Sequence, residues 1–369
     1  MNPDPVELLR GLVATPSLST HEAEAVAYLV GQMAGMGFAA CADEAGNAVG
    51  VRERPDTAGA IATEIVLLGH IDTVPGDIPV RIEDGKLFGR GSVDAKGPLA
   101  TFVMAAAQAE LLPGTRLVVV GAVEEEAATS KGARHAVKHY QPQFCVIGEP
   151  SGWDGVTLGY KGRLRLRYSL ARPMAHTAGL AASPADEAVA WWNGVLHYAD
   201  TFNAGRERLF DRILPSISDL ETGSDGLTNT AAIHAGLRLP PGVDIDALGA
   251  ELRRLAGDAS LETYAYEQAF QTDRSNSLAR AFSQALREAG TAPHFKLKTG
   301  TSDMNVVGPE WGCPIVAYGP GDSALDHTPG EHVLVADYLK AIDILVRVLG
   351  TLQTQHAVPA IRLAAGGQS

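Results

Sequence analysis

The sequence has few cysteines, no long apolar run and a deficit of basic residues, and each shortage argues against a class of protein. Its 369 residues include three cysteines, Cys41, Cys145 and Cys313, an odd and widely spaced set that forms no disulfide framework. We expect all three to be reduced and buried. No apolar run approaches the ~18 residues that cross a bilayer, and the first residues lack a signal-peptide layout. The expected location is the cytoplasm, with no membrane partner.

Acidic side chains outnumber basic ones, 43 to 30, which gives a formal net charge of −13. This balance argues against nucleic acid as a partner. Hydrophobic residues make up 46% and charged residues 20% of the chain, as in ordinary globular proteins. A length of 369 residues favours two domains over a single core.

Two styles of sequence divide the chain. In 1–160 and again in 273–369, solidly apolar strands alternate with helical segments, which predicts an α/β fold with a mostly parallel sheet covered by helices. In 161–272 the strands alternate polar and apolar residues, and the order is close to β-α-β-β-α-β. We therefore predict a discontinuous catalytic domain with an inserted small α+β, ferredoxin-like domain.

Four apolar runs of the first style each stop at side chains that can bind a metal ion. The runs are 64–72, 115–126, 143–149 and 314–327, and the side chains are His70, the Glu124–Glu126 cluster, Glu149 and His327. In an open α/β sheet, sites form beyond the carboxyl ends of the strands. A further candidate, Asp94, lies in GRGSVDAKGPLA (89–100), whose glycines leave the backbone free to place it.

Each of these residues has a plainer interpretation when it is taken alone. His70 could be a polar loop residue, Asp94 a solvated residue in a glycine-rich turn, and Glu124–Glu126 a solvated loop. Three adjacent acids are costly to pack, however, unless cations neutralise them. The conjunction favours one dinuclear metal site over several unrelated loops. Asp72, two residues after His70, could fix the imidazole tautomer.

Two histidines and three carboxylates could hold two divalent ions, with one carboxylate as a bridge. Zinc suits mixed nitrogen and oxygen ligands, and cobalt or manganese could replace it. Such ions acidify a bound water, and a remaining glutamate could then pass a proton to a leaving nitrogen. The expected chemistry is attack by a metal-activated hydroxide that expels a nitrogen leaving group.

At these motifs the sequence resembles the dinuclear zinc amidohydrolase and peptidase family that includes acetylornithine deacetylase, succinyl-diaminopimelate desuccinylase and carboxypeptidase G. The matching segments, in order, are GHIDTVP, GRGSVDAKG, the glutamate cluster, GEP and the late histidine. The resemblance covers nearly the whole chain. It implies that His70 and Glu149 bind one ion, Glu126 and His327 the other, and that Asp94 bridges them. It also implies that Asp72 orients His70, that Glu125 is the general base, and that the Asp94–Ala95 peptide is cis.

The same resemblance gives the inserted domain a role as a lid and dimerisation domain. His176 in RPMAHTAG resembles a histidine that reaches the partner subunit's site and stabilises the tetrahedral oxyanion. The plainer alternative is a surface turn. Asn229 resembles a lid residue that touches substrate, and Thr301 and Gly319 resemble substrate-side loops. A homodimer is therefore expected.

Two local features narrow the substrate. The segments 123–134 and 156–164 resemble a subgroup of lysine-biosynthesis enzymes that release lysine, or ornithine, from the C-terminal glutamate of a small acidic amino-group carrier protein. In addition, a strand would place Lys161, Arg163, Arg165 and Arg167 on one face, where they could attract such a carrier and contact the substrate. A solvated sheet face is the alternative.

Other functions stay open at this point. A sister enzyme could act on free acetylornithine, succinyl-diaminopimelate or a dipeptide. A catalytically silent metal-binding relative is a second alternative, against which the retention of Glu125 argues. A serine hydrolase is disfavoured, because the sequence has neither G-x-S-x-G nor S-x-x-K.

Overall fold

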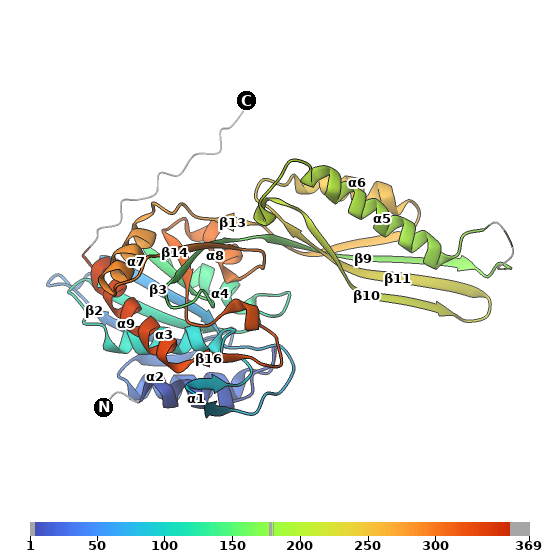
Figure 1. Cartoon of the computed structure of the whole chain (residues 1–369). Coiled ribbons are helices and arrows are strands. Elements are labelled where there is room, and N and C mark those ends of the chain that lie inside the picture. Colours follow the sequence, from blue (N-terminus) through green and yellow to red (C-terminus); the bar gives the residue numbers. More distant parts are fainter. Residues whose placement is uncertain (1–3, 177–178, 180, 355–369) are drawn as a thin grey trace. The chain divides into compact units, whose positions relative to one another are not determined.

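The computed structural model describes residues 4–176, 179 and 181–354, which form two compact units (Figure 1). The sheet unit comprises the chain up to Gly159, Thr272–Lys296 and the chain from Ser302. The inserted unit comprises Tyr160–Gln271 and Leu297–Thr301. Each unit is described by itself below.

A mixed sheet forms the centre of the sheet unit, with strand order β1-β2-β6-β3-β7-β15-β8 and β14 also beside β8. The strands are β1 (Ala39–Ala42), β2 (Ala48–Arg54), β3 (Thr63–His70), β6 (Thr115–Ala122), β7 (Phe144–Gly148), β8 (Gly155–Tyr160), β14 (His294–Lys298) and β15 (Ile315–Tyr318). The central strands β6, β3, β7 and β15 are parallel, whereas β2 and β8 run antiparallel to their neighbours β6 and β15. All of β3 is buried except the half-buried Glu64, so both faces of the sheet are covered.

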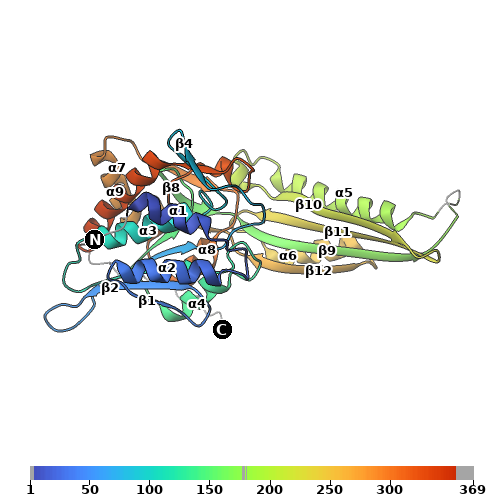
Figure 2. The same ribbon diagram turned by 90° about the horizontal axis from the view of Figure 1, so that it is seen from below.

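Helices supply that cover (Figure 2). They are α1 (Pro5–Ala14), α2 (Ala23–Gly35), α3 (Lys96–Gln108), α4 (Lys131–His139), α7 (Ser277–Glu288), α8 (Asp303–Trp311) and α9 (Val335–Leu352). The alanine-rich α3 packs against β3, β6 and β7 on one side and against α1 and α9 on the other. A small sheet of β4 (Arg81–Glu83), β5 (Lys86–Phe88) and β16 (His332–Leu334) completes the unit. One short 3-10 helix, η2 (Ser323–Leu325), precedes β16 in the chain.

The inserted unit has the predicted β-α-β-β-α-β order. Its elements are β9 (Gly162–Pro173), α5 (Pro184–Asn203), β10 (Leu214–Ser224), β11 (Thr228–Leu239), α6 (Ile245–Ala256) and β12 (Ser260–Glu267), with η1 (Leu209–Asp211) before β10 and β13 (Phe270–Gln271) after β12. The antiparallel strand order β10-β11-β9-β12 is ferredoxin-like. Both helices lie on one face of this sheet (Figure 1), over Leu164, Leu166 and Tyr168 of β9. The predicted fold class is confirmed.

Leu297–Thr301 belongs to the inserted unit, whereas sequence alone assigned all of 273–369 to the first domain. Hydrogen bonds explain the difference. The Lys161 amide donates to the Lys298 carbonyl at 3.2 Å. The Thr301 hydroxyl donates to the Lys161 carbonyl at 3.1 Å and accepts from Arg238 Nη1 at 2.8 Å.

The three cysteines are free, but only Cys145 is buried. The expectation of burial was wrong for Cys41, because it lies on β1, an outer strand that is largely exposed. No described helix combines the length and apolar character that a membrane span requires.

Candidate metal centre

Parallel strands bring the predicted metal-binding residues to one edge of the sheet. His70 is the last residue of β3, Glu124–Glu126 follow β6, Glu149 follows β7, and His327 lies in the loop after β15. Since these four strands are adjacent and parallel, their carboxyl ends share an edge. Asp94 joins them from the loop that precedes α3.

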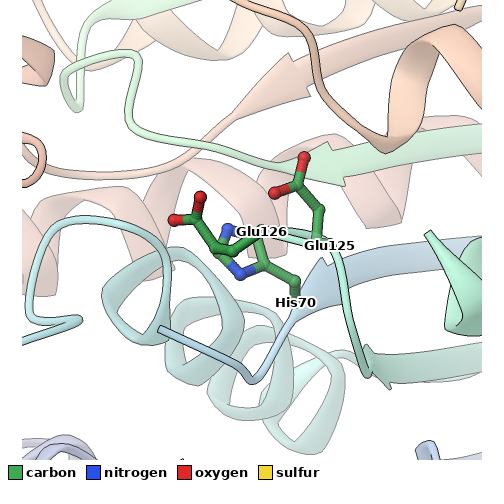
Figure 3. Close-up of side chains that lie close together, drawn as sticks. All are labelled: His70, Glu125 and Glu126. Atoms are coloured by element: carbon green, nitrogen blue, oxygen red, sulfur yellow. The ribbon is translucent and has the colours of Figure 1, made fainter. Parts of the chain in front are cut away.

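Three groups of side chains in the described chain have ligand atoms within 4.8 Å of one another. The groups are His70 with Glu125 and Glu126, His70 with Asp94 and Glu149, and Asp94 with Glu126 and His327. Figure 3 shows the first of these, with the two carboxylates on the loop after β6 beside the imidazole at the end of β3. Asp94 is shared by the other two groups, which is the arrangement that a bridging ligand requires. Nitrogen and oxygen donors of these types suit zinc and related divalent ions.

Distances within the cluster fit ligands of common ions. His327 Nε2 lies 2.9 Å from Asp94 Oδ2 and 2.9 Å from Glu126 Oε1. His70 Nε2 lies 3.3 Å from Asp94 Oδ1. Two ligands bound to one tetrahedral ion at about 2 Å are themselves roughly 3.3 Å apart. Small adjustments would therefore convert these hydrogen bonds into two coordination spheres.

The carboxylates of the cluster hold protons on both histidines when no other cation neutralises them. Hydrogen bonds to Asp94 and Glu126 raise the pKa of His327 to about 10. Burial disfavours the charged form of His70, but hydrogen bonds to Asp72 and Asp94 outweigh it and raise its pKa well above the usual value. Burial likewise works against ionised Asp94, yet the hydrogen bonds from both imidazoles hold its pKa far below the usual range.

Asp72 connects His70 to the acidic loop after β6. Its carboxylate is fully buried and lies 3.4 Å from His70 Nδ1, which is also 3.1 Å from the Asp72 carbonyl. The amides of Glu125 and Glu126 donate to Asp72 Oδ1 and Oδ2 at 3.1 and 3.0 Å. Asp72 therefore orients an imidazole and the two neighbouring glutamates at the same time.

Glu125 has the properties of a proton carrier. Burial of its carboxyl raises its pKa well above the ordinary value. Attraction to His70 opposes that rise, whereas repulsion from Glu149, Asp303 and Glu126 adds to it. A carboxyl group with a raised pKa can hold a proton near neutral pH and return it.

Glu124 turns away from the cluster. Its backbone is left-handed, with φ of 58°, so the chain bends as it leaves β6. Its carboxylate accepts a hydrogen bond from the Thr129 hydroxyl at 2.6 Å and lies 3.6 Å from Lys131 Nζ. The geometry thus groups Glu125 and Glu126, and not Glu124, with the other candidate ligands.

The loop that carries Asp94 depends on its glycines. Gly91 has φ of 84°, and a Cβ there would lie 2.8 Å from Thr73 Cγ2. A Cβ on Gly97 would lie 2.4 Å from the Ser92 carbonyl oxygen. The Asp94–Ala95 peptide bond is cis, as the resemblance implied.

The residues of this centre lie within a segment that matches a known protein family. The model of peptidase family M20/M25/M40 matches residues 66–351. The chain belongs to this family. It is a hydrolase of the M20 type, and the resemblance read from its motifs is confirmed.

Two curated relatives and one solved structure illustrate the family. LysW-lysine hydrolase of Deinococcus radiodurans is 48% identical over 354 residues, which cover 94% of this chain and 96% of the relative. LysW-lysine/LysW-ornithine hydrolase of Saccharolobus islandicus is 28% identical over 292 residues, covering 76% and 81%. A dinuclear metal-binding M20 peptidase of Bacillus subtilis has the same fold, with a TM-score of 0.69, 14% identity and coverage of 95% and 98%.

In the inserted unit of this M20 hydrolase, His176 and Asn229 come together. Both line a cavity of about 530 Å³ beside Arg172 and Glu187. His176 is exposed and follows β9, and Asn229 lies near the start of β11 opposite Arg172. Two residues predicted separately from the sequence thus share one hollow.

Lys161 does not join the predicted cationic stripe. It is buried, and its ammonium group donates to the carbonyls of Leu209 at 3.2 Å, Phe210 at 3.1 Å and Arg212. Burial lowers its pKa to about 8. The prediction that Lys161 belongs to an exposed cationic stripe was wrong, because the strand begins only at Gly162 and the Lys161 side chain is buried within the inserted unit.

The other predicted substrate residues have mainly structural neighbours. Arg163 is half-buried, and its Nε donates to the Ala265 carbonyl at 3.3 Å. Thr301 bridges Lys161 and Arg238, as described above. The Gly319 carbonyl accepts from the Ser151 amide at 3.0 Å, and a Cβ on Gly319 would lie 2.5 Å from Pro98.

Several residues that brace the site were not singled out from the sequence. The Ser19 hydroxyl donates to Asp72 Oδ2 at 2.7 Å, and Glu22 Oε1 accepts from the Glu124 amide at 3.1 Å. Glu331 accepts hydrogen bonds from the loop of Asp94. For Glu331 the sequence pattern gives no signal, because its partners lie more than 200 residues away along the chain.

We expect metal binding to release protons. At pH 7.5 the raised pKa of His327, about 10, means that its imidazole is protonated in the metal-free protein, and the raised pKa of His70 acts in the same direction. An imidazole must lose that proton to coordinate a metal ion. Affinity should therefore rise with pH up to about 10, the pKa of His327. Calorimetric zinc titrations in buffers of different ionisation enthalpy measure the protons released. A buffer-independent heat would contradict the expectation.

Proposed function

We propose that this protein hydrolyses the amide bond between lysine, or ornithine, and the C-terminal glutamate of an acidic amino-group carrier protein. One observation carries the chemistry: Asp94 is shared by two groups of candidate ligands, next to Glu125 with its raised pKa. The choice of substrate is supported by 48% identity to a LysW-lysine hydrolase over nearly the full length of both chains.

The proposed ligand set has His70 and Glu149 on one ion, Glu126 and His327 on the other, and Asp94 between them. We propose zinc as the resident metal, with cobalt as the alternative. Two such ions, when bound, polarise the scissile carbonyl and lower the pKa of a water. The grouping of these side chains within 4.8 Å supports the set.

Glu125 supplies the proton transfer in this proposal. Its carboxylate takes a proton from the attacking water and delivers it to the leaving amine nitrogen of lysine. The raised pKa of Glu125 supports this role, because the group must keep the proton between the two steps. Asp72 fixes His70 and the backbone of the acidic loop, so that Glu125 stays in place during turnover.

His176 and Asn229 act on the substrate side in this proposal, with His176 delivered to the site of a second subunit. Their shared cavity supports a joint role. The outer strand β10 supports a dimer through the inserted unit, since its apolar Ile217 and Leu220 are 41% and 51% exposed. Unpaired strand edges and exposed apolar side chains are typical of interfaces.

The carrier would meet the face of the inserted sheet that α5 and α6 leave open. Arg165 and Arg167 are exposed there, because the intervening Leu164, Leu166 and Tyr168 point to the helices. Glu262 lies opposite Arg167 in register, so the face is mixed in charge and the attraction is moderate. We also propose a cytoplasmic location, which the three free cysteines support.

Replacing Glu125 tests the reaction. Glu125→Gln should lower kcat for release of lysine from the carrier-linked substrate by ~10²–10⁴-fold, because proton transfer is lost. The variant should still bind two ions. Glu124→Gln, a matched change on the neighbouring residue, should keep kcat within about twofold, since Glu124 points elsewhere. Full turnover by Glu125→Gln, or faster hydrolysis of acetylornithine than of the carrier by the unaltered enzyme, would overturn the proposal.

Mixed dimers test whether His176 acts in the other subunit. His176→Ala and Glu125→Gln homodimers should both be nearly inactive. Once they are mixed and allowed to exchange subunits, half of the dimers are hybrids, each with one complete site, so activity should return to about one quarter of wild type. Mixtures that stay inactive although hybrids have formed would contradict delivery in trans, as would a fully active monomer.

Charge removal tests the carrier-binding face. Arg165→Ala/Arg167→Ala should raise KM for the carrier-linked substrate about three- to tenfold at low salt and weaken its salt dependence, with kcat unchanged. Arg253→Ala/Arg254→Ala, which removes the same charge from the end of α6, serves as the control and should leave KM unaltered. An equal rise of KM in both double variants would indicate only an effect of net charge.

A further inference from the structure

Glu331 is a fully buried carboxylate outside the groups of candidate metal ligands. It lies directly before β16, four residues after His327, and has no exposed surface. It belongs to none of the metal-binding groups found among the described residues. Burial of a carboxylate is costly unless its charge is paired and its oxygens accept hydrogen bonds. The contacts that offset this cost indicate what the residue does.

Each oxygen of Glu331 has a defined partner. Oε1 accepts from the amides of Val93 and Asp94 at 2.9 and 3.2 Å. Oε2 accepts from Arg90 Nη1 at 2.7 Å. Every one of these donors lies in the glycine-rich loop that presents Asp94. The carboxylate therefore fixes the backbone of that loop at the position where the Asp94 side chain leaves it.

Arg90 extends the connection to the loop of His327. Its guanidinium, 13% exposed, also approaches the carbonyl of Thr328 at 3.5 Å and donates through Nε to the carbonyl of Gly76 at 3.1 Å. The backbone carbonyl of Glu331 in turn accepts from the Gly89 amide at 3.4 Å. Two loops more than 200 residues apart in sequence are thereby joined beside the cluster.

We propose that Glu331, paired with Arg90, is a positioning residue that keeps Asp94 and His327 in register as ligands of the two ions. The proposal rests on the ligand set given under Proposed function. Asp94 must direct Oδ1 towards His70 and Oδ2 towards His327, at 3.3 and 2.9 Å. A bridging carboxylate tolerates little rotation, because a turn that improves one contact lengthens the other. The hydrogen bond from the Asp94 amide to Glu331 limits that rotation. Because the His327 loop is connected to the same Glu331 carboxylate, the distance between Asp94 and His327 is kept.

Glu331→Gln is the most informative change. The amide keeps one oxygen for the Val93 and Asp94 amides but turns an NH₂ group towards Arg90. We expect zinc dissociation constants to rise about 10–100-fold, as is typical when a residue behind a ligand is lost. At saturating zinc, kcat should fall while KM for the substrate stays within about twofold, because the altered loops hold ligands and not substrate. Arg90→Lys, which retains the charge but not the fork of donors, should weaken zinc binding in the same direction and less.

Glu64→Gln is the matched control. Glu64 likewise joins an arginine and a backbone amide, with Oε2 accepting from Arg116 Nη1 at 3.2 Å and Oε1 from the Gln141 amide at 3.3 Å. It lies near the start of β3, at the opposite end from His70. We expect this variant to lose thermal stability without any change in zinc affinity. A purely structural role for Glu331 would give the same pattern.

Calorimetric zinc titration of the folded wild type, Glu331→Gln, Arg90→Lys and Glu64→Gln separates the outcomes. Weaker zinc binding in Glu331→Gln and Arg90→Lys, but not in Glu64→Gln, supports the proposal. If folded Glu331→Gln binds two zinc ions as tightly as the wild type, the proposal is overturned. If Glu331→Gln fails to fold, Arg90→Lys decides in the same way. A wild type that binds fewer than two ions would count against the ligand set itself, which is a different failure.

Discussion

The carboxylate of Asp94, held between two imidazoles, is the interaction on which the rest of the site depends. Carboxyl groups of Asp72, Asp94, Glu125, Glu126 and Glu149 gather at one edge of the sheet, and their mutual repulsion must be balanced by cations. Protons on His70 and His327 can provide that balance, and so can divalent ions. The same ligand atoms could therefore accept either kind of cation.

Around this centre the chain places supports that lie outside the groups of candidate metal ligands. Asp72 holds one imidazole and the acidic loop, while Glu331 holds the glycine-rich loop. From the segment between α1 and α2, Ser19 contacts Asp72 and Glu22 contacts the acidic loop. Such contacts set ligand orientation more finely than the strands can, since a strand end fixes only where a side chain begins.

The layout of the site could be predicted from the sequence because it depends on strand order. Solid apolar strands that stop at His70, Glu149 and the acidic cluster must, in a parallel sheet, end on one edge. The β-α-β-β-α-β insertion was predictable from alternation and helix length in the same way, even though the polar β10 gave no clear strand pattern of its own. Lys161 was wrongly assigned to the cationic stripe, because the alternation of polar and apolar residues already includes the residue before β9. This alternation cannot reveal that the Lys161 side chain binds backbone carbonyls. Glu331 and Leu297–Thr301 depend on long-range hydrogen bonds, which leave no periodic trace.

The order in which the ligands occur along the chain has a consequence for biosynthesis. His70, Asp94, Glu125, Glu126 and Glu149 all precede the insertion, so two of the three groups of candidate ligands are already encoded when the ribosome reaches the inserted unit. The other group lacks His327 until that whole unit, and β15 after it, has been translated. A nascent chain therefore carries two of these groups before the inserted unit is translated, whereas the group that contains His327, and with it the proposed two-ion centre, can form only after β15 and the loop that follows it.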